Sequence, residues 1–274
     1  MAHVVKRGAV RVVKPLVDER TWQRLRRLGG APAAAPRSRP SLTEIGVACG
    51  TDKASAHSYT GHYQRHFEHL RDEEFTLFEI GIGGGTRRTR GGESLRMWKK
   101  FFSRATVVGL DINDKSYVQE PRIRVYQGDQ ADPEILTRIM RENAPVTIVV
   151  DDGSHRPEHV RASFDVLFPL LPEGGLYAIE DTQTSYWPPW GGSVDRHARG
   201  TTMALVKDLV DGLNYEEFLE DSYEPSYTDR HVCAVHAFHN LVIIEKGVNA
   251  EGSNRHRTRR AREAAAQLNA RPDR

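Results

Sequence analysis

The sequence is poor in cysteine and has no long hydrophobic run. Its two cysteines, Cys49 and Cys233, lie far apart and lack CxxC spacing, so we expect buried free thiols in a reducing cytoplasm rather than a disulfide scaffold. No segment approaches the roughly twenty apolar residues of a membrane-spanning helix, and the first residues lack the apolar core of a signal peptide. These absences predict a soluble, cytoplasmic protein without a membrane partner.

The sequence also lacks a strong excess of either charge. Lysine and arginine total 39 and aspartate and glutamate 37, giving a net charge of +2 over 274 residues. Both signs are interspersed through the middle of the chain, whereas a nucleic-acid-binding domain usually carries a basic patch. The length suits one well-buried α/β domain with short appendages.

The two ends of the chain differ in composition from the middle. The run GGAPAAAPRSRP, Gly29 to Pro40, is typical of a linker. Before it, Trp22, Leu25 and Leu28 recur at helical spacing among arginines, which fits either a solvated extension or a short amphipathic helix for self-association or anionic surfaces. After Lys246 the polar, arginine-rich sequence predicts a frayed tail, with nucleic-acid binding as the alternative. We therefore predict a basic extension and linker over 1–40, a catalytic domain over 41–247 and a basic, flexible tail over 248–274.

Strand-like and helix-like segments alternate between these ends. Such alternation predicts an α/β fold with a doubly wound, mostly parallel sheet. The last two strands are separated only by His239 and Asn240, which predicts a tight antiparallel hairpin. The predicted strands are Leu77 to Ile82, Thr106 to Ile112, Ile123 to Gln127, Val146 to Val150, Gly175 to Ile179, Val232 to Phe238 and Leu241 to Glu245, and the predicted helices are Glu93 to Phe102, Pro133 to Glu142 and Pro157 to Leu171.

A glycine-rich segment follows the first predicted strand. In FEIGIGGG, Glu79, Gly81 and Gly83 lie where missing side chains allow a ligand to approach the backbone closely. The stretch TRRTRGG then delays the next helix to Glu93. This delay argues against a nicotinamide dinucleotide, whose phosphates need a helix N-terminus beside them. A glycine turn that merely connects a strand to a helix is the alternative.

Acidic and amide side chains end the next two predicted strands. Asp111 ends the second strand, where a carboxylate can accept both hydroxyl hydrogens of a ribose. Asp129 and Gln130 end the third, where they would read the edge of an adenine. Three successive strand ends would then contact one nucleoside. S-adenosylmethionine contains such a nucleoside and has no phosphate.

Two acidic clusters end the following two predicted strands. The first, DDGSH, begins at Asp151, and the second, IED, ends at Asp181. Neighbouring parallel strands lie roughly 4.8 Å apart, so Asp152, Glu180 and Asp181 can reach one cation. Hard oxygen donors favour Mg²⁺. Strand alternation places Asp151 and Asp152 on opposite sides of the sheet but does not show which side holds the metal. The structural alternative is that these acidic residues only cap strand ends and start helices.

These motifs resemble those of the Mg²⁺-dependent sugar O-methyltransferases of natural-product pathways, which include macrolide, rhamnosyl and mycinamicin-type tailoring enzymes. The resemblance spans roughly Gly50 to Gly247. It rests on GTDK, HSYTGHY, FEIGIGGG, GGESLRMWKKFF, GLDI, QGDQ, DDGSH and IEDTQTSYW. It implies a class I methyltransferase fold, S-adenosylmethionine and Mg²⁺ as cofactors, and methyl transfer to a sugar hydroxyl in antibiotic biosynthesis.

The same resemblance implies roles for individual residues. It makes Asp152, Glu180 and Asp181 the metal ligands and His155 the general base. In this hypothesis two sugar hydroxyls chelate Mg²⁺, which aligns one oxygen behind the methyl carbon, and the histidine removes its proton. The segment containing Tyr63 is expected to close over the cofactor, as in the family.

Aromatic residues follow the second acidic cluster. In YWPPWGG, Tyr186, Trp187 and Trp190 offer rigid faces that either stack on a sugar ring or pack the loop against the core. The expected acceptor is a glycoside or a nucleotide sugar, and the resemblance suggests a homo-oligomer. Two alternatives stay open at this point. The first is a metal-dependent methyltransferase of catechol-like phenols, and the second is a nucleic-acid-binding protein with a methyltransferase-like fold.

Overall fold

A computed structural model describes residues 39–87, 89–220 and 222–255 of the chain. The chain divides into two units between Pro40 and Ser41, and the fold described here is that of the second unit. The predicted amphipathic segment, most of the linker and the arginine-rich tail beyond residue 255 lie outside the described residues. The division into extension, domain and tail stays a prediction.

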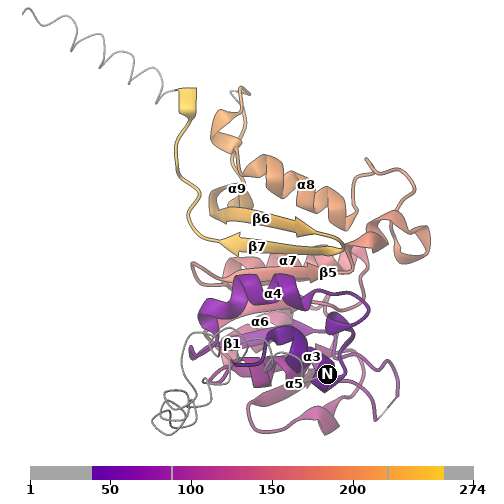
Figure 1. The fold of residues 1–274 in the computed structure, drawn as a ribbon. Helices are drawn as coiled ribbons and strands as arrows, with labels where there is room; N and C mark the ends of the chain where they lie inside the picture. Colours follow the sequence, from indigo (N-terminus) through magenta and orange to yellow (C-terminus); the bar gives the residue numbers. More distant parts are fainter. Residues whose placement is uncertain (1–38, 88, 221, 256–274) are drawn as a thin grey trace, which may run out of the picture. The chain divides into compact units, whose positions relative to one another are not determined.

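A seven-stranded sheet forms the centre of this unit (Figure 1). The strand order is β3-β2-β1-β4-β5-β7-β6. The first five strands are parallel, and β7 runs antiparallel to both of its neighbours. This topology confirms the predicted fold class. The strands are β1 (Thr76–Ile80), β2 (Thr106–Asp111), β3 (Ile123–Gln127), β4 (Val146–Asp151), β5 (Leu176–Glu180), β6 (Val232–Phe238) and β7 (Leu241–Lys246).

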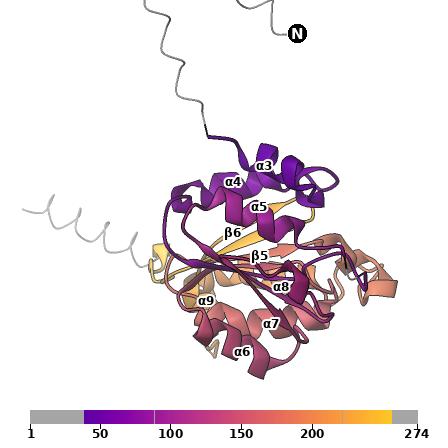
Figure 2. The ribbon, with the colours of Figure 1, turned by 90° about the horizontal axis from the view of Figure 1, so that it is seen from below.

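Helices cover both faces of the sheet (Figure 2), with α3, α4 and α5 on one face and α6 and α7 on the other. Helix α8 packs against α7 and contributes side chains to the core on the face of α6 and α7. The helices are α3 (Leu42–Cys49), α4 (Thr60–Phe67), α5 (Glu93–Phe101), α6 (Pro133–Glu142), α7 (Pro157–Leu170), α8 (Thr202–Gly212) and α9 (Tyr227–His231). Short 3₁₀ turns are η1 (Asp52–Ala54), η2 (Glu68–Leu70), η3 (Ser116–Val118), η4 (Thr182–Tyr186), η5 (Pro188–Trp190) and η6 (Tyr215–Glu217).

Strand β1 shows how alternation divides the interior into two cores. Leu77 packs into the core beneath α3, α4 and α5, and Phe78 and Ile80 pack into the core beneath α6 and α7. Glu79 shares the face of Leu77 and is fully buried, which places a carboxylate inside an apolar layer. A buried carboxylate is costly unless it is paired, so this residue requires partners.

The termini of two helices follow from their capping residues. Ser41 begins α3 with a capping box, in which its side chain accepts from the Glu44 N–H and the Glu44 carboxylate accepts from the Ser41 N–H. Asp132 caps α6 by accepting from two backbone N–H groups, and Pro133 occupies the first helical position. The predicted bounds of α6 match the observed ones.

The structure contains elements that the sequence pattern did not predict. Helix α4 was missed because its sequence, TGHYQRHF, is largely polar. Its buried residues are Thr60, Tyr63 and Phe67, which recur at helical spacing on one narrow face. Helices α3, α8 and α9 were also missed. The predicted β6–β7 hairpin is confirmed, and Asn240 in its turn adopts the left-handed conformation with φ of 62°.

The expectation that both cysteines are buried was wrong. Cys49 is half-buried at the end of α3, and Cys233 is exposed. Cys233 lies on β6, the edge strand of the sheet, where one side of the strand lacks a neighbour. No helix among the described residues is both long and apolar enough to cross a membrane.

Candidate active site and metal centre

A cavity of about 540 Å³ lies at the carboxyl ends of the parallel strands. Strands β1 and β4 are neighbours in the sheet, and the strand order reverses between them. Ligands of open α/β sheets bind at such a switch point. Nine of the predicted site residues line the cavity, namely Gly81, Gly83, Asp111, Asp129, Gln130, Asp152, His155, Glu180 and Asp181.

Asp111 joins the end of β2 to the glycine segment. Its Oδ2 accepts a 3.0 Å hydrogen bond from the Ile82 N–H, and its Oδ1 accepts a 2.9 Å bond from the Asn113 N–H. A carboxylate has about four acceptor positions, so these two bonds leave capacity for the hydroxyls of a ribose. The carboxylate thus has a fixed orientation at the wall of the cavity.

Gly81 allows two loops to pass close together. Its φ is 87°, and a Cβ at this position would lie 2.1 Å from the backbone oxygen of Asp152. The Asp152 N–H in turn donates to the Ile80 carbonyl at 3.0 Å. The sequence predicted that a ligand approaches the backbone closely at Gly81. In the structure, the backbone of Asp152, in the loop after β4, lies close to Gly81.

The structure distinguishes Asp151 from Asp152, which strand alternation left undecided. Asp151 ends β4 and is buried, and its Oδ2 accepts hydrogen bonds from Ser163 at 2.6 Å and Tyr177 at 3.1 Å. Burial raises the pKa of Asp151. Asp152 follows the strand and lines the cavity. Asp152 is therefore the aspartate of this pair that lies at the cavity wall.

Gln130 braces the loop that carries the acidic cluster. Its Nε2 donates to Asp151 at 3.1 Å, and its Oε1 accepts from the Ser154 N–H at 2.6 Å. Both ends of its amide are therefore engaged by protein groups, although the residue lines the cavity. Asp129, beside it, accepts from the Ala131 N–H at 2.9 Å. The prediction that this pair reads an adenine edge stays a prediction.

A buried lysine lies within the acidic cluster. The Nζ of Lys53 lies 2.5 Å from Asp152, 2.8 Å from Glu180 and 3.4 Å from Glu79. The residue is 1% exposed. Burial opposes its charged form, but the three carboxylates outweigh that effect and raise the pKa of Lys53. The lysine is thus a fixed positive charge among groups that would otherwise repel one another.

Two tyrosines from the segment before β1 orient the second acidic cluster. The Tyr63 hydroxyl donates to Glu180 Oε1 at 2.6 Å, and the Tyr59 hydroxyl donates to Asp181 Oδ1 at 2.8 Å. Burial, followed by the charge of Asp152, raises the pKa of Glu180. Crowded acidic groups of this kind favour a cation beside them.

Two residues that were predicted to contact the cofactor, Glu79 and Tyr63, are not among the residues that line the cavity. Glu79 is held by Ser94 at 2.7 Å and by the Trp98 indole N–H at 2.6 Å, in addition to Lys53. Tyr63 is fully buried against Glu180. Both lie behind the carboxylates of the cavity wall. Glu79 contacts Lys53, and Tyr63 donates to Glu180.

His155 lies beside two half-buried carboxylates of the cluster, those of Asp152 and Asp181. Its Nε2 is 3.6 Å from Asp181 Oδ2 and 4.0 Å from Asp152 Oδ1. Both His155 and Asp181 have left-handed backbones, with φ of 56° and 53°. The Thr184 hydroxyl lies 2.9 Å from the carbonyl oxygens of both residues. Such conformations persist where the surroundings enforce them, and they concentrate at functional sites.

The donor set fits a divalent cation. Asp152, His155 and Asp181 each offer an atom within 4.8 Å of the others, and Glu180 lines the same cavity. Carboxylate oxygens are the ligands that Mg²⁺ prefers, whereas an imidazole nitrogen suits softer ions. The set therefore fits Mg²⁺ on the carboxylates and leaves the imidazole available for proton transfer.

Of the predicted aromatic residues, Trp190 lies beside a residue of the cavity wall, and none of the three lines the cavity itself. Tyr186, Trp187 and Trp190 are 43%, 47% and 43% exposed, in and between the turns η4 and η5. The Trp190 ring centroid lies 6.1 Å from that of His155. Exposed aromatic faces next to a candidate base suit a sugar ring. Their role in substrate binding stays a prediction.

The sequence placed Asp52 and Lys53 in a segment expected to close over the cofactor but gave neither an individual role, and it did not single out His57. Asp52 and His57 line the cavity, and the Nδ1 of His57 lies 3.5 Å from Asp181 Oδ1. Asp52, Lys53 and His57 lie before β1, where no strand end marks them. The motifs GTDK and HSYTGHY were the available signal.

Sequence comparison places these motifs among known enzymes, although no protein-family model matches the chain. Demethylmacrocin O-methyltransferase from Streptomyces fradiae is 50% identical over 223 residues, covering 80% of this chain and 56% of that protein. Mycinamicin VI 2''-O-methyltransferase from Micromonospora griseorubida is 47% identical over 217 residues, covering 78% and 54%. An 8-demethyl-8-alpha-L-rhamnosyl tetracenomycin-C 2'-O-methyltransferase from Streptomyces olivaceus is 44% identical over 219 residues, covering 80% and 58%.

The close homologues of this chain are sugar O-methyltransferases of macrolide and tetracenomycin pathways, and the chain belongs to their family. This confirms the resemblance that the motifs carry. The chain spans little more than half the length of these relatives.

Solved structures agree with the sequence comparison. The MycE methyltransferase from the mycinamycin biosynthetic pathway, in complex with Mg and SAH, has a TM-score of 0.76 and 47% identity, covering 78% of this chain and 55% of that one. Its complex with Mg, SAH and mycinamycin VI has a TM-score of 0.75 and 42% identity, covering 86% and 64%. The chain has the class I methyltransferase fold.

Proposed function

We propose that this chain transfers a methyl group from S-adenosylmethionine to a hydroxyl of a sugar on a natural-product glycoside, with Mg²⁺ as the metal. One observation carries the proposal. A single cavity joins Asp111, a carboxylate suited to a ribose, to the carboxylates of Asp152, Glu180 and Asp181. The similarity to sugar O-methyltransferases, and to a structure that holds Mg and SAH, supports both cofactors.

The cofactor end of the cavity suits the nucleoside. Asp111 is oriented by two backbone N–H groups and would accept hydrogen bonds from the ribose hydroxyls. Gly81 and Gly83 keep the neighbouring wall free of side chains. Asp129, at the end of β3, would lie beside the adenine. These residues would bind the cofactor so that its methyl group points toward the acidic cluster.

The acidic end of the cavity supplies the chemistry. Asp152, Glu180 and Asp181 would hold the metal, with Lys53, Tyr63 and Tyr59 fixing their orientation. Mg²⁺ held by these carboxylates would supply a positive charge that lowers the pKa of a sugar hydroxyl bound beside it. His155 would accept the proton from that hydroxyl, because its Nε2 lies beside the same carboxylates. The deprotonated oxygen would form a bond to the methyl carbon as the bond from that carbon to sulfur breaks, and S-adenosylhomocysteine would leave as a neutral thioether.

The acceptor that we favour is a glycosylated aglycone rather than a nucleotide sugar. Several relatives are named for methylating macrolides or rhamnosyl tetracenomycins, which are glycosides. The exposed Trp190 beside His155 would stack on the sugar ring and leave the aglycone outside the cavity.

An acceptor panel tests the proposal. Purified protein with S-adenosylmethionine and Mg²⁺ would be given macrolide glycosides, rhamnosylated tetracenomycins, nucleotide sugars and a catechol, and the products analysed by mass spectrometry. We expect one added methyl group on a sugar of a glycoside. The Asp181→Asn protein should give no product, while Glu73→Gln, which removes an exposed carboxylate far along the chain, should behave as wild type. Methylation of the catechol alone would contradict the sugar acceptor.

A further inference from the structure

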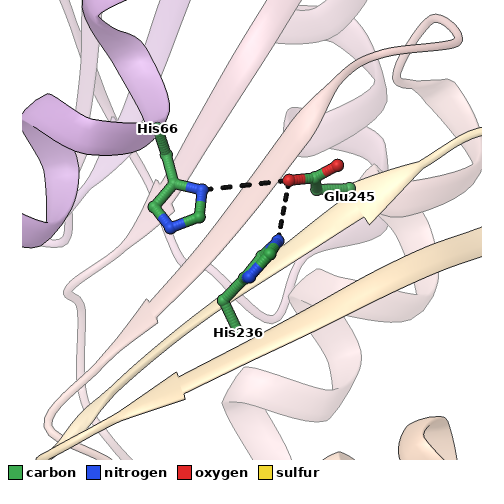
Figure 3. A group of neighbouring side chains, drawn as sticks. All are labelled: His66, His236 and Glu245. Carbon is green, nitrogen blue, oxygen red and sulfur yellow. Dashed lines mark hydrogen bonds and ion pairs between the residues drawn. The ribbon is translucent and has the colours of Figure 1, made fainter.

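A second cluster of potential metal ligands lies away from the cavity. His66 on α4, His236 on β6 and Glu245 on β7 each offer a ligand atom within 4.8 Å of the others. Figure 3 shows both imidazoles turned toward the carboxylate of Glu245. None of these three residues lines the cavity described above.

The fold brings these residues together from three separate elements. In the β6–β7 pairing His236 is opposite Ile243 and Ala234 is opposite Glu245, so the histidine and the glutamate are diagonal neighbours. Helix α4 lies over this edge of the sheet, and its His66 ring is 4.3 Å from the His236 ring between centroids. The cluster therefore connects a helix to the terminal hairpin.

The distances suit a tetrahedral ion. The Nε2 of His236 lies 2.7 Å from Glu245 Oε1, and the Nδ1 of His66 lies 3.8 Å from the same atom. Bonds of about 2.0–2.1 Å to a tetrahedral ion set neighbouring ligand atoms roughly 3.3 Å apart. The two observed distances lie on either side of that value, so small side-chain rotations would create the site.

The chemistry of the cluster differs from that of the acidic cavity. Two imidazoles and one carboxylate suit Zn²⁺ and similar ions, whereas Mg²⁺ prefers oxygen ligands alone. The His66 side chain is 10% exposed and those of His236 and Glu245 are 34% and 39% exposed. Water can therefore reach the site and occupy a fourth ligand position.

We propose that His66, His236 and Glu245 form a second metal site, which binds a borderline transition-metal ion such as Zn²⁺ and fastens α4 to the β6–β7 hairpin. The site shares no residue with the cavity. The two are connected through α4, which also carries Tyr63, whose hydroxyl donates to Glu180.

The first experiment is a titration with Zn²⁺ alone. It uses tag-free, chelator-treated protein in the Asp181→Asn background, which removes a ligand from the acidic cluster, and calorimetry gives the stoichiometry and the affinity. We expect one equivalent to bind. His236→Gln and Glu245→Gln in the same background should each weaken binding by at least about tenfold. His69→Gln, which removes an exposed histidine from the neighbouring turn, is the matched control and should leave it unchanged.

Two further measurements assess the geometry and the fold. Co²⁺ bound in place of Zn²⁺ should show the visible absorption of a four-coordinate ion, and this should disappear in His66→Gln. Hydrogen exchange of the α4 amides should slow when Zn²⁺ binds. Circular dichroism without metal checks that each variant folds, which we expect because two of the three side chains are about one-third exposed. Equal Zn²⁺ affinity in the control and the ligand variants, or no binding to any of them, would overturn the proposal.

Discussion

The Nζ of Lys53 lies 2.8 Å from the Oε1 of Glu180, and both side chains are almost fully buried. The lysine comes from the turn η1, before the first strand, and the glutamate ends β5. Their contact couples the chain segment that precedes the sheet to the acidic edge of the sheet. Because the same lysine also contacts Asp152 and Glu79, its removal leaves several carboxylates without a counter-charge.

The first prediction concerns Lys53→Met, which keeps the length of the side chain and removes its charge. Breaking a buried ion pair by removing one partner costs about 3–5 kcal/mol of the free energy of unfolding. Burial already raises the pKa of Glu180, and losing the ammonium raises it further. A folded-state pKa above that of the unfolded chain makes stability fall as pH rises toward neutral. The deficit should therefore shrink in acid, as measured by denaturant unfolding at two pH values.

A surface pair provides the control for this prediction. Lys99 lies 2.7 Å from Glu120, and both side chains are partly exposed. Exposed pairs contribute at most about 1 kcal/mol, so Lys99→Met should have a small effect. Equal losses in the two variants would contradict the role assigned to Lys53.

The second prediction concerns Tyr63→Phe. The phenyl ring keeps its packing against Phe67 and Trp98, with centroids 5.1 and 5.2 Å away, but the hydrogen bond to Glu180 is lost. Loss of a group that orients a metal ligand typically costs about 10–100-fold in metal affinity. We expect a weakening of Mg²⁺ binding in this range, measured by titration of cofactor-bound protein.

Tyr126→Phe is the matched change for this measurement. Its hydroxyl donates to Glu142 at 3.0 Å, in a pair outside the acidic cluster. Mg²⁺ affinity should stay at the wild-type value in this variant. A Tyr63→Phe protein that binds Mg²⁺ as tightly as Tyr126→Phe would refute the orienting role.

The third prediction separates a base from a metal ligand. His155→Gln should lower the rate of methyl transfer by about 10²–10⁴-fold, the usual contribution of a positioned base. It should leave Mg²⁺ and S-adenosylmethionine binding close to wild type. Asp181→Asn should instead weaken Mg²⁺ binding. If His155→Gln weakened Mg²⁺ binding as much as Asp181→Asn, His155 would be a ligand and the assignment of base would be wrong.

The fourth prediction uses two glycines with similar backbones. Gly81 and Gly174 have φ of 87° and 77°, but an added Cβ would lie 2.1 Å from the Asp152 backbone oxygen at Gly81, whereas at Gly174 it would meet open space among the described residues. Gly174→Ala should cost about 1 kcal/mol for its backbone conformation alone. Gly81→Ala should cost clearly more and should also weaken Mg²⁺ binding, because Asp152 must move. Chemical unfolding of both variants gives the difference, and equal costs would argue against the close approach.

The sheet could be predicted from the sequence because its strands leave a strong signal. Strands β4 and β5 are covered on both faces, so they appear as continuous apolar runs that end at acidic residues. Since the strands are parallel, the ends of these runs lie at one edge, which is why nine predicted residues line one cavity.

The segment before the sheet could not be predicted in the same way. A buried lysine reads as a surface residue until its three carboxylate partners are placed around it. Helix α4 is mostly polar, because it covers the sheet with a narrow buried face and uses Tyr63 to reach a carboxylate. The choice between Asp151 and Asp152 likewise required the positions of Ser163 and Tyr177.

Metal-dependent methyl transfer is tested by the transfer of a labelled methyl group from S-adenosylmethionine to a demethylated macrolide glycoside, with Mg²⁺ and with a chelator in parallel. We expect label on a sugar hydroxyl when Mg²⁺ is present and its loss when the metal is removed, with recovery on adding Mg²⁺ back. Label that appears equally with the chelator would contradict the role of the acidic cluster as a metal site. Cofactor binding without label on any sugar would contradict the proposed acceptor.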